Sequence, residues 1–167
     1  PFVRRGECAT HPHVAGIRSI DARGAGCRYE DHGSTTSNNA AFGTDYFTRT
    51  AVARSNIFVN GPNETKYFYQ DMDGSGTRLS GTSRYTLTFP KDQTPRVNGF
   101  WSLTLYNEQH FLVPNDIKRY SVGTKNKDLQ LDADGSLTVY VQSEAPTDKR
   151  QRANWLPSAK EQEFSLF

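Results

Sequence analysis

The chain has 167 residues, and its net charge is only +2 because 20 basic residues are nearly balanced by 18 acidic ones. This size fits one domain with a sizeable core, and the scattered charges form no basic stripe, which argues against nucleic acid as a partner. No run approaches the roughly 20 apolar residues of a membrane span, and the N-terminus lacks the apolar stretch of a secretory signal. We therefore expect a soluble globular domain.

Residues 1–41 are expected to form an irregular arm or linker that makes few core contacts. They are rich in Arg, Gly, Ser, Thr and Asn and show neither helical nor strand periodicity. Cys8 and Cys27 leave three states open: free thiols, a disulfide, or a zinc site with the histidines His11, His13 and His32. Free thiols are favoured because the spacing matches no common zinc finger, so no metal and no cofactor is expected.

A helix is predicted from about Thr44 to Ile57, where aromatic and small apolar residues recur at helical spacing. Asp45 in its first turn suits the helix dipole. A second short helical turn is predicted at Pro62, because proline is favoured at a first helical position. Helices therefore make a small contribution to the fold.

From Tyr67 onward the apolar residues recur with a period of two, as in strands with one buried face. Six residues occupy the inward positions of three such segments and are expected in the core: Leu87, Phe89, Leu103, Leu105, Val139 and Val141. Turn signals rich in Asp, Gly and Pro separate the segments. Many short strands with these turns predict a mainly β fold over residues 42–167, an antiparallel β-sandwich or barrel with one or two short helices.

Two Asp-rich turns could hold calcium or simply close hairpins. The first starts at Asp71 like a calcium loop, but its twelfth position is Thr82 instead of a bidentate Glu. The second contains Asp134-Gly135, a common hairpin dipeptide. Hairpin turns are the favoured interpretation of both.

Three stretches in the second half carry a resemblance to a known family. They are VNGFWSLTLYN (97–107), FLVPNDIKRYSVG (111–123) and NWLP (154–157), with the hairpin 134–137 between the last two. In this order they resemble the domain of unknown function 1214, the C-terminal half of the two-domain 1254/1214 family. The resemblance covers about residues 42–167. It implies a jelly-roll-like β-sandwich with a helix packed at one side, preceded by an N-terminal partner domain.

A chain that starts with Pro1 and lacks that partner domain is expected to be a processed or truncated piece. Its location is left open, with an extracytoplasmic compartment as one option. The state of oligomerisation is not encoded in the pattern.

The sequence gives no catalytic signature. There is no G-x-S-x-G elbow, and His110 is the one histidine in the family-like region. Glycoside hydrolysis needs two carboxylates beside a cleft, and the sequence offers Glu108, Asp116 and Asp132 without fixing their separation.

The candidate ligand-binding residues coincide with the family motifs: Asn115, Arg119, Tyr120, Asn154 and Trp155. They could line a cleft in which aromatic faces stack on a carbohydrate while Arg119 and the amides donate hydrogen bonds to it or to a small anion. They could instead serve the fold, with Asn115 closing a turn and Trp155 covering the core, and this interpretation is favoured because buried aromatic residues in β-sandwiches ordinarily pack in the core. Strand alternation would bury Ile117 and Arg119 on one face, so Arg119 is expected to meet a carboxylate, Asp132 or Glu108, or several backbone carbonyls.

Two functions follow as hypotheses. The first is a non-enzymatic binding or assembly module for carbohydrate or a partner domain. The second is part of a hydrolase whose site is completed by the missing N-terminal domain. A pocket with close carboxylates, or a carboxylate beside His110, would favour the enzyme, whereas a flat aromatic patch or an unpaired strand edge would favour binding.

Overall fold

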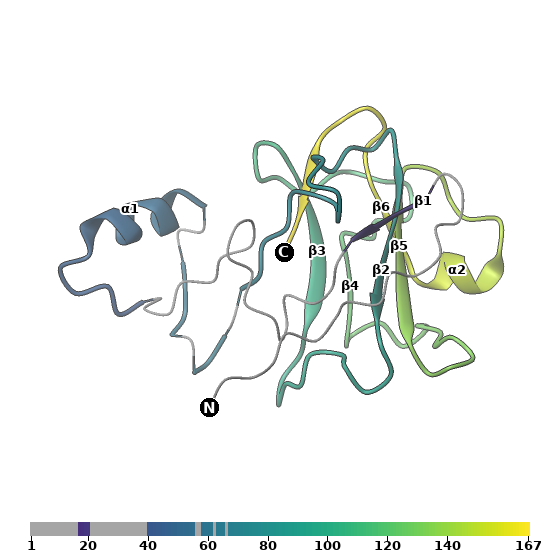
Figure 1. Cartoon of the computed structure of the whole chain (residues 1–167), viewed down its shortest axis with the longest axis horizontal. Coiled ribbons are helices and arrows are strands. Elements are labelled where there is room, and N and C mark those ends of the chain that lie inside the picture. Colours follow the sequence, from purple (N-terminus) through teal and green to yellow (C-terminus); the bar gives the residue numbers. More distant parts are fainter. Residues whose placement is uncertain (1–16, 21–39, 56–57, 62, 66) are drawn as a thin grey trace.

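A computed structural model describes residues 17–20, 40–55, 58–61, 63–65 and 67–167. The predictions for the cysteines and histidines of the arm lie outside these residues. The described helices and strands, in chain order, are β1 (Ile17–Ile20), α1 (Tyr46–Ser55), β2 (Arg84–Phe89), β3 (Ser102–Asn107), β4 (Ser121–Gly123), β5 (Leu137–Gln142), α2 (Lys149–Ala153), β6 (Trp155–Pro157) and β7 (Phe164–Leu166). Strands dominate, so the prediction of a mainly β fold is confirmed (Figure 1).

The larger sheet has four strands in the order β1-β2-β5-β6. Its centre is the antiparallel pair β2 and β5, in which Tyr85 lies opposite Val141 and Phe89 opposite Leu137. Both outer strands are parallel to their neighbours, β1 to β2 and β6 to β5. The prediction of a purely antiparallel sheet is therefore wrong, because β1 and β6 reach the sheet through long connections that local sequence patterns do not reveal.

The smaller sheet has three strands in the order β4-β3-β7, both pairs antiparallel. Its last strand in the sequence, β7, is not at the edge. Leu166 pairs with Leu105 of β3 on one side and with Gln70 on the other, where the Gln70 and Leu166 main chains exchange two hydrogen bonds of 2.8 Å. The residues around Gln70 thus extend this sheet beyond β7.

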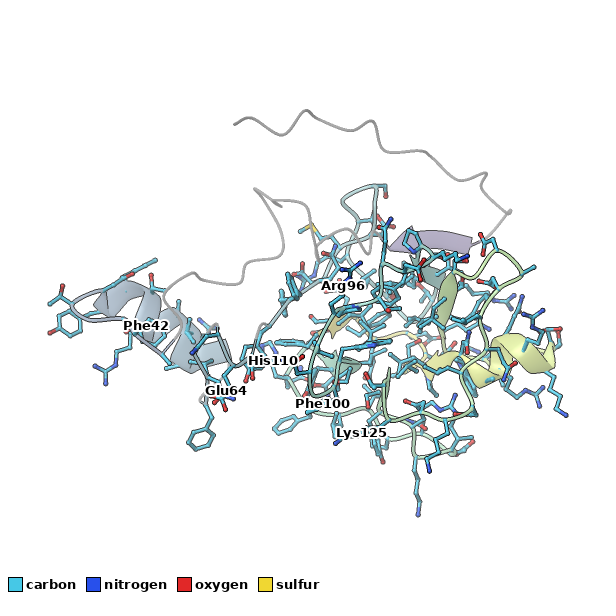
Figure 2. The ribbon with its side chains drawn as sticks, turned by 90° about the horizontal axis from the view of Figure 1, so that it is seen from below. Phe42, Glu64, Arg96, Phe100, His110 and Lys125 are labelled. Carbon is cyan, nitrogen blue, oxygen red and sulfur yellow. The ribbon has the colours of Figure 1, made fainter. Side chains whose placement is uncertain are left out.

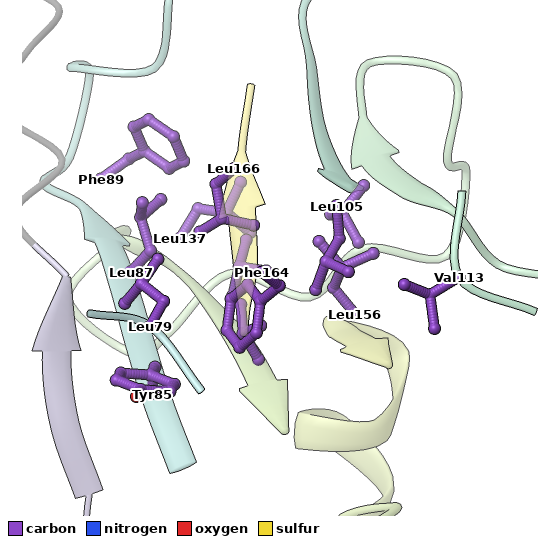
Figure 3. Packing of buried hydrophobic residues seen from close by; sticks show 13 residues of the cluster. Leu79, Tyr85, Leu87, Phe89, Leu105, Val113, Leu137, Leu156, Phe164 and Leu166 are labelled. Carbon is purple, nitrogen blue, oxygen red and sulfur yellow. The ribbon is translucent and has the colours of Figure 1, made fainter. Parts of the chain in front are cut away.

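The two sheets share one hydrophobic core (Figure 3). Of the six residues predicted inside, five are buried, and Leu103 is half-buried against the same cluster. The period-two pattern identified them because alternate side chains of a strand point to the same face. Further core residues come from outside the predicted strands, including Leu79, Val122, Leu156, Phe164 and Leu166.

Both Asp-rich turns close hairpins. In the first, Asp73 and Thr77 are joined by a main-chain bond of 2.8 Å, and Asp73 Oδ1 accepts from the amides of Ser75 and Thr77. In the second, Gly135 has a φ of +84°, a conformation in which glycine avoids the strain of a side chain. The carboxylates of these turns therefore hold the chain in place.

The two helices differ from expectation. α1 is shorter than the predicted 44–57, and it projects away from the sheets (Figure 1), so the helix that the family resemblance implied at one side of the sandwich is not packed there. Phe47 and Phe58 are 87% and 82% exposed. Near Pro62, the amides of Glu64 and Thr65 both donate to the Gly61 carbonyl, at 2.9 and 3.1 Å, and the second bond has the spacing of a single helical turn, as predicted. α2 was not predicted, although Asp148 marks its start by accepting from the amide of Gln151 at 2.9 Å.

Candidate functional site

The loop between Val113 and Tyr120 is closed by the side chain of Asn115. Its Nδ2 donates to the carbonyls of Val113 and Arg119 at 3.2 and 2.8 Å, and its Oδ1 accepts from the Arg119 amide at 2.9 Å. Lys118 adopts a left-handed φ of +51° inside this loop. The segment is therefore a turn and not a strand, and Ile117, predicted inward by alternation, is 49% exposed.

The guanidinium of Arg119 joins this loop to the end of α2. Nη1 donates to the main-chain carbonyls of Arg152, Ala153 and Trp155 at 3.3, 2.8 and 3.1 Å. Nη2 pairs with Asp128 at 3.1 Å, and the Arg119 side chain is 19% exposed. A cation is favourable here because the last carbonyls of a helix lack partners within the helix. The predicted kinds of partner are confirmed, but the carboxylate is Asp128 and not Asp132 or Glu108.

Asn154 and Trp155 are buried where α2 passes into β6. Asn154 Nδ2 donates to the carbonyls of Gln130 and Thr138 at 2.7 and 2.9 Å, and its Oδ1 accepts from the Gln130 amide at 2.9 Å. Trp155 Nε1 donates to the Gln142 carbonyl at 2.8 Å. These two side chains therefore fasten β5 and the preceding loop to β6.

The structure thus brings four of the five candidate residues into one clasp around the α2–β6 junction, formed by Asn115, Arg119, Asn154 and Trp155. Apart from the ion pair between Arg119 and Asp128, their side-chain hydrogen bonds go to main-chain groups. Tyr120 follows as a half-buried residue whose carbonyl accepts from the Leu105 amide at 3.2 Å. A ligand role for the five residues stays a prediction.

A second group, which the sequence analysis did not single out, lies on the outer face of the smaller sheet. We call it the aromatic platform, and it consists of Tyr69, Tyr106, His110 and Phe167. The ring of Phe167 is central: its centroid lies 4.8 Å from that of Tyr69, 5.0 Å from that of Tyr106 and 6.3 Å from that of His110. All three contacts are edge-on, with interplanar angles of 75° to 86°, a favourable arrangement for aromatic pairs.

Strand register places the platform on the face away from the core. Leu105 and Leu166 face inward and are buried, so the neighbouring Tyr106 and Phe167 face outward. Tyr69, Tyr106 and Phe167 are half-buried and His110 is exposed. In Figure 2, His110 lies at the margin of the sheet body on the side of α1.

The rim of the platform is also apolar. Leu112 pairs with Tyr106 across an isolated bridge and is 44% exposed, and its neighbour Phe111 is 69% exposed. Tyr106 was the available signal in the sequence, since it follows Ser102 and Thr104 on the otherwise polar face of β3.

The carboxylates that lie close together in the described part of the chain have partners within the fold: Asp132 and Asp134 both accept from Ser136 Oγ, and Asp71 and Glu163 both pair with Arg78. The ring contact of His110 is with Phe167, and no cluster of three His, Cys, Asp or Glu side chains is placed to hold a metal ion among those residues. Asp132 accepts from the hydroxyls of Ser136 and Thr138 in its hairpin. Glu108 and Asp116 are exposed on turns.

A shallow hollow lies within the β2–β3 loop and is lined by Asp92 and residues 94–98. None of the carboxylates named as hydrolase candidates, Glu108, Asp116 and Asp132, lines this hollow. No helix in the described residues is long and apolar enough to cross a membrane.

Comparison with known proteins gives a family but no activity. A family model described as a protein of unknown function (DUF1214) matches residues 64–167, and the chain belongs to this family. No curated protein matches the chain. A crystal structure of the VPA0106 protein from Vibrio parahaemolyticus is 27% identical, with a TM-score of 0.48 over 59% of this chain and 24% of that one. The chain thus spans about a quarter of the length of that relative.

Proposed function

We propose that this domain is a non-enzymatic binding or assembly module that uses the aromatic platform as its contact surface. The single observation behind the proposal is a cluster of four rings on the outer face of the smaller sheet, with apolar neighbours around it. Contiguous exposed apolar surface of this kind is typical of interaction sites. The proposal also takes the two sheets as the layers of a jelly-roll-like sandwich, with the platform on the outside of one layer.

A protein partner suits the platform better than a carbohydrate does. Sugar sites combine an aromatic face with several polar groups that converge on the hydroxyls. Here the polar neighbours on the same face are short hydroxyl side chains, Ser102 and Thr104, and the Tyr69 hydroxyl is already 3.0 Å from Ser165 Oγ. Tyr and Phe are enriched at the centre of protein interfaces.

The partner that we propose is an N-terminal domain of the 1254 type, in the two-domain arrangement expected from the sequence. Such a domain would cover the platform and bury Phe111 and Leu112 at its rim. The hydrolase hypothesis is the alternative, and it requires that the partner complete a site containing a nucleophile or an acid and a base.

Isothermal titration with the separately produced N-terminal half of a two-domain family member tests this proposal. We expect Tyr106→Ser to weaken binding by about tenfold or more, as for the central aromatic residue of an interface. Phe100→Ser is the matched control, because Phe100 is 57% exposed but lies in the β2–β3 loop with its ring under Lys125 (Figure 2).

Three results would contradict the proposal. They are binding that Tyr106→Ser leaves unchanged, binding that Phe100→Ser weakens as much, and binding of polysaccharides in place of the domain. Hydrolysis of chromogenic esters or glycosides by the combined domains would favour the enzyme. The melting temperature of each variant shows whether a loss of binding reflects a loss of folding.

A further inference from the structure

One edge of the larger sheet is covered by a strand from outside the family domain. β2 is flanked by β5 on one side and by β1 on the other, with Ile17 opposite Arg84 and Ile20 opposite Leu87. The match to the family model begins at residue 64. The domain itself therefore ends this sheet at β2, and the arm supplies the strand that completes it.

Without β1, the edge of β2 would be a strong template for another strand. Arg84–Phe89 has the sequence RYTLTF, which contains aromatic and β-branched residues and no proline. Its inward residues Tyr85, Leu87 and Phe89 are fixed in the core, so the strand stays in place and presents its free amides and carbonyls. Such an edge binds an extended segment through main-chain hydrogen bonds, a recurring mode of recognition.

The chain connecting β1 to the rest of the protein allows the segment to reach another molecule. Residues 21–45, which are 25 residues, separate β1 from α1. At 3.3 Å per residue this length can span about 80 Å, whereas a domain of this size is about 40 Å across. The connection therefore does not restrict Ile17–Ile20 to the β2 strand of its own chain.

A second copy of this chain is the occupant that the register specifies, because its segment 17–20 would form the same parallel pairing. We propose that β1 is an exchangeable strand and that two copies swap it reciprocally, each placing its Ile17–Ile20 on the β2 edge of the other. The first exchanged strand must compete with pairing inside one chain, where the covalent connection gives an effective concentration of about a millimolar. Once one β1 strand has paired with the β2 strand of the other copy, the second exchange takes place within the same dimer. Only the first exchange therefore has to compete with pairing inside one chain.

Disulfide trapping between differently labelled copies tests the exchange. One full-length copy carries Ser19→Cys and the other carries Thr86→Cys, positions that face each other in the register, and Cys8 and Cys27 are Ser in both. The matched control replaces the second copy with Thr88→Cys, a half-buried threonine on the same face of β2, two residues further along and beyond the end of the β1 pairing. Paired strand positions lie within the roughly 4.4–6.8 Å between Cα atoms that a disulfide needs, and a shift of two residues exceeds it.

We expect a cross-linked heterodimer with Thr86→Cys whose yield rises with protein concentration and exceeds that with Thr88→Cys by about tenfold. Equal yields with both acceptors would mean random collision and would overturn the proposal. A single chain carrying both Ser19→Cys and Thr86→Cys provides the remaining comparison. If it closes an internal disulfide while the mixed copies give no heterodimer, β1 pairs only within its own chain, and if neither cross-link forms, the pairing itself is absent; both results overturn the exchange.

Discussion

Replacement of Arg119 should destabilise the domain well beyond the usual effect of a surface arginine. Its guanidinium is mostly buried, and it donates hydrogen bonds to three main-chain carbonyls at the α2–β6 junction. Hydrogen bonds to a charged group contribute about 1.5–3 kcal/mol each, but the 19% exposure lets water replace part of them in Arg119→Ala. We therefore expect a loss of about 2–3 kcal/mol in the free energy of unfolding.

Two further variants separate the carbonyl contacts from the ion pair. Asp128 is 55% exposed, so Asp128→Ala should cost less than about 1 kcal/mol. Arg119→Lys keeps the charge but loses the planar arrangement of donors, and it should recover only about half of the loss.

Urea unfolding is the measurement for all three variants, because an unchanged m-value shows that the midpoint reports stability. For a chain of this length the Arg119→Ala loss corresponds to a decrease of about 5–10 °C in the melting temperature. If Arg119→Ala costs no more than Asp128→Ala, the clasp does not stabilise the fold. If phosphate or acetate also raises the melting temperature of the parent but not of Arg119→Ala, a small anionic ligand is the better explanation of this arginine.

Three other predictions concern single features of the fold. Burial raises the pKa of Tyr140 above its ordinary value near 10, so the unfolded state loses the phenol proton at a lower pH than the folded state does. The free energy of unfolding should therefore decrease as the pH rises above about 10. Tyr140→Phe should reduce this decrease in unfolding curves measured at several alkaline pH values. Gly81→Ala should cost more than about 2 kcal/mol in chemical unfolding, because a Cβ would lie 1.6 Å from a main-chain carbonyl oxygen, whereas Gly99→Ala meets nothing within 4 Å and should be neutral. Phe47→Ser with Phe58→Ser should change the free energy of unfolding by less than about 0.5 kcal/mol, because both rings are exposed, and a larger loss would show that α1 packs on the domain.

The core of the larger sheet was predicted correctly because the alternating pattern that identifies it lies within short stretches of the sequence. Leu87 and Val139 sit in six-residue strands long enough to show a period of two, and Asp134-Gly135 marks the turn that precedes β5. Three-residue strands such as β6 and β7 show no such period. Parallel pairing of β1 and β6 depends on chain connections that no short window contains.

The candidate site was likewise predicted only where local sequence patterns carry the information. The partners of Arg119 were predicted in kind from the cost of burying an unpaired charge, but the alternation used to bury it was wrong, since its segment is a turn closed by Asn115. The aromatic platform was missed because Tyr69, Tyr106 and Phe167 lie far apart in the sequence. Only the register of the smaller sheet brings these rings together.

The interior position of β7 affects how the protein can fold during synthesis. Residues 164–166 lie between β3 and the segment around Gln70. The smaller sheet therefore cannot be completed until residues 164–166 have left the ribosome. Until then Leu105 lacks its partner Leu166, and the nascent chain exposes apolar surface that chaperones bind. Removal of residues 164–166 would take away an interior strand and two core side chains, Phe164 and Leu166, so a chain that lacks them should be degraded by cellular quality control.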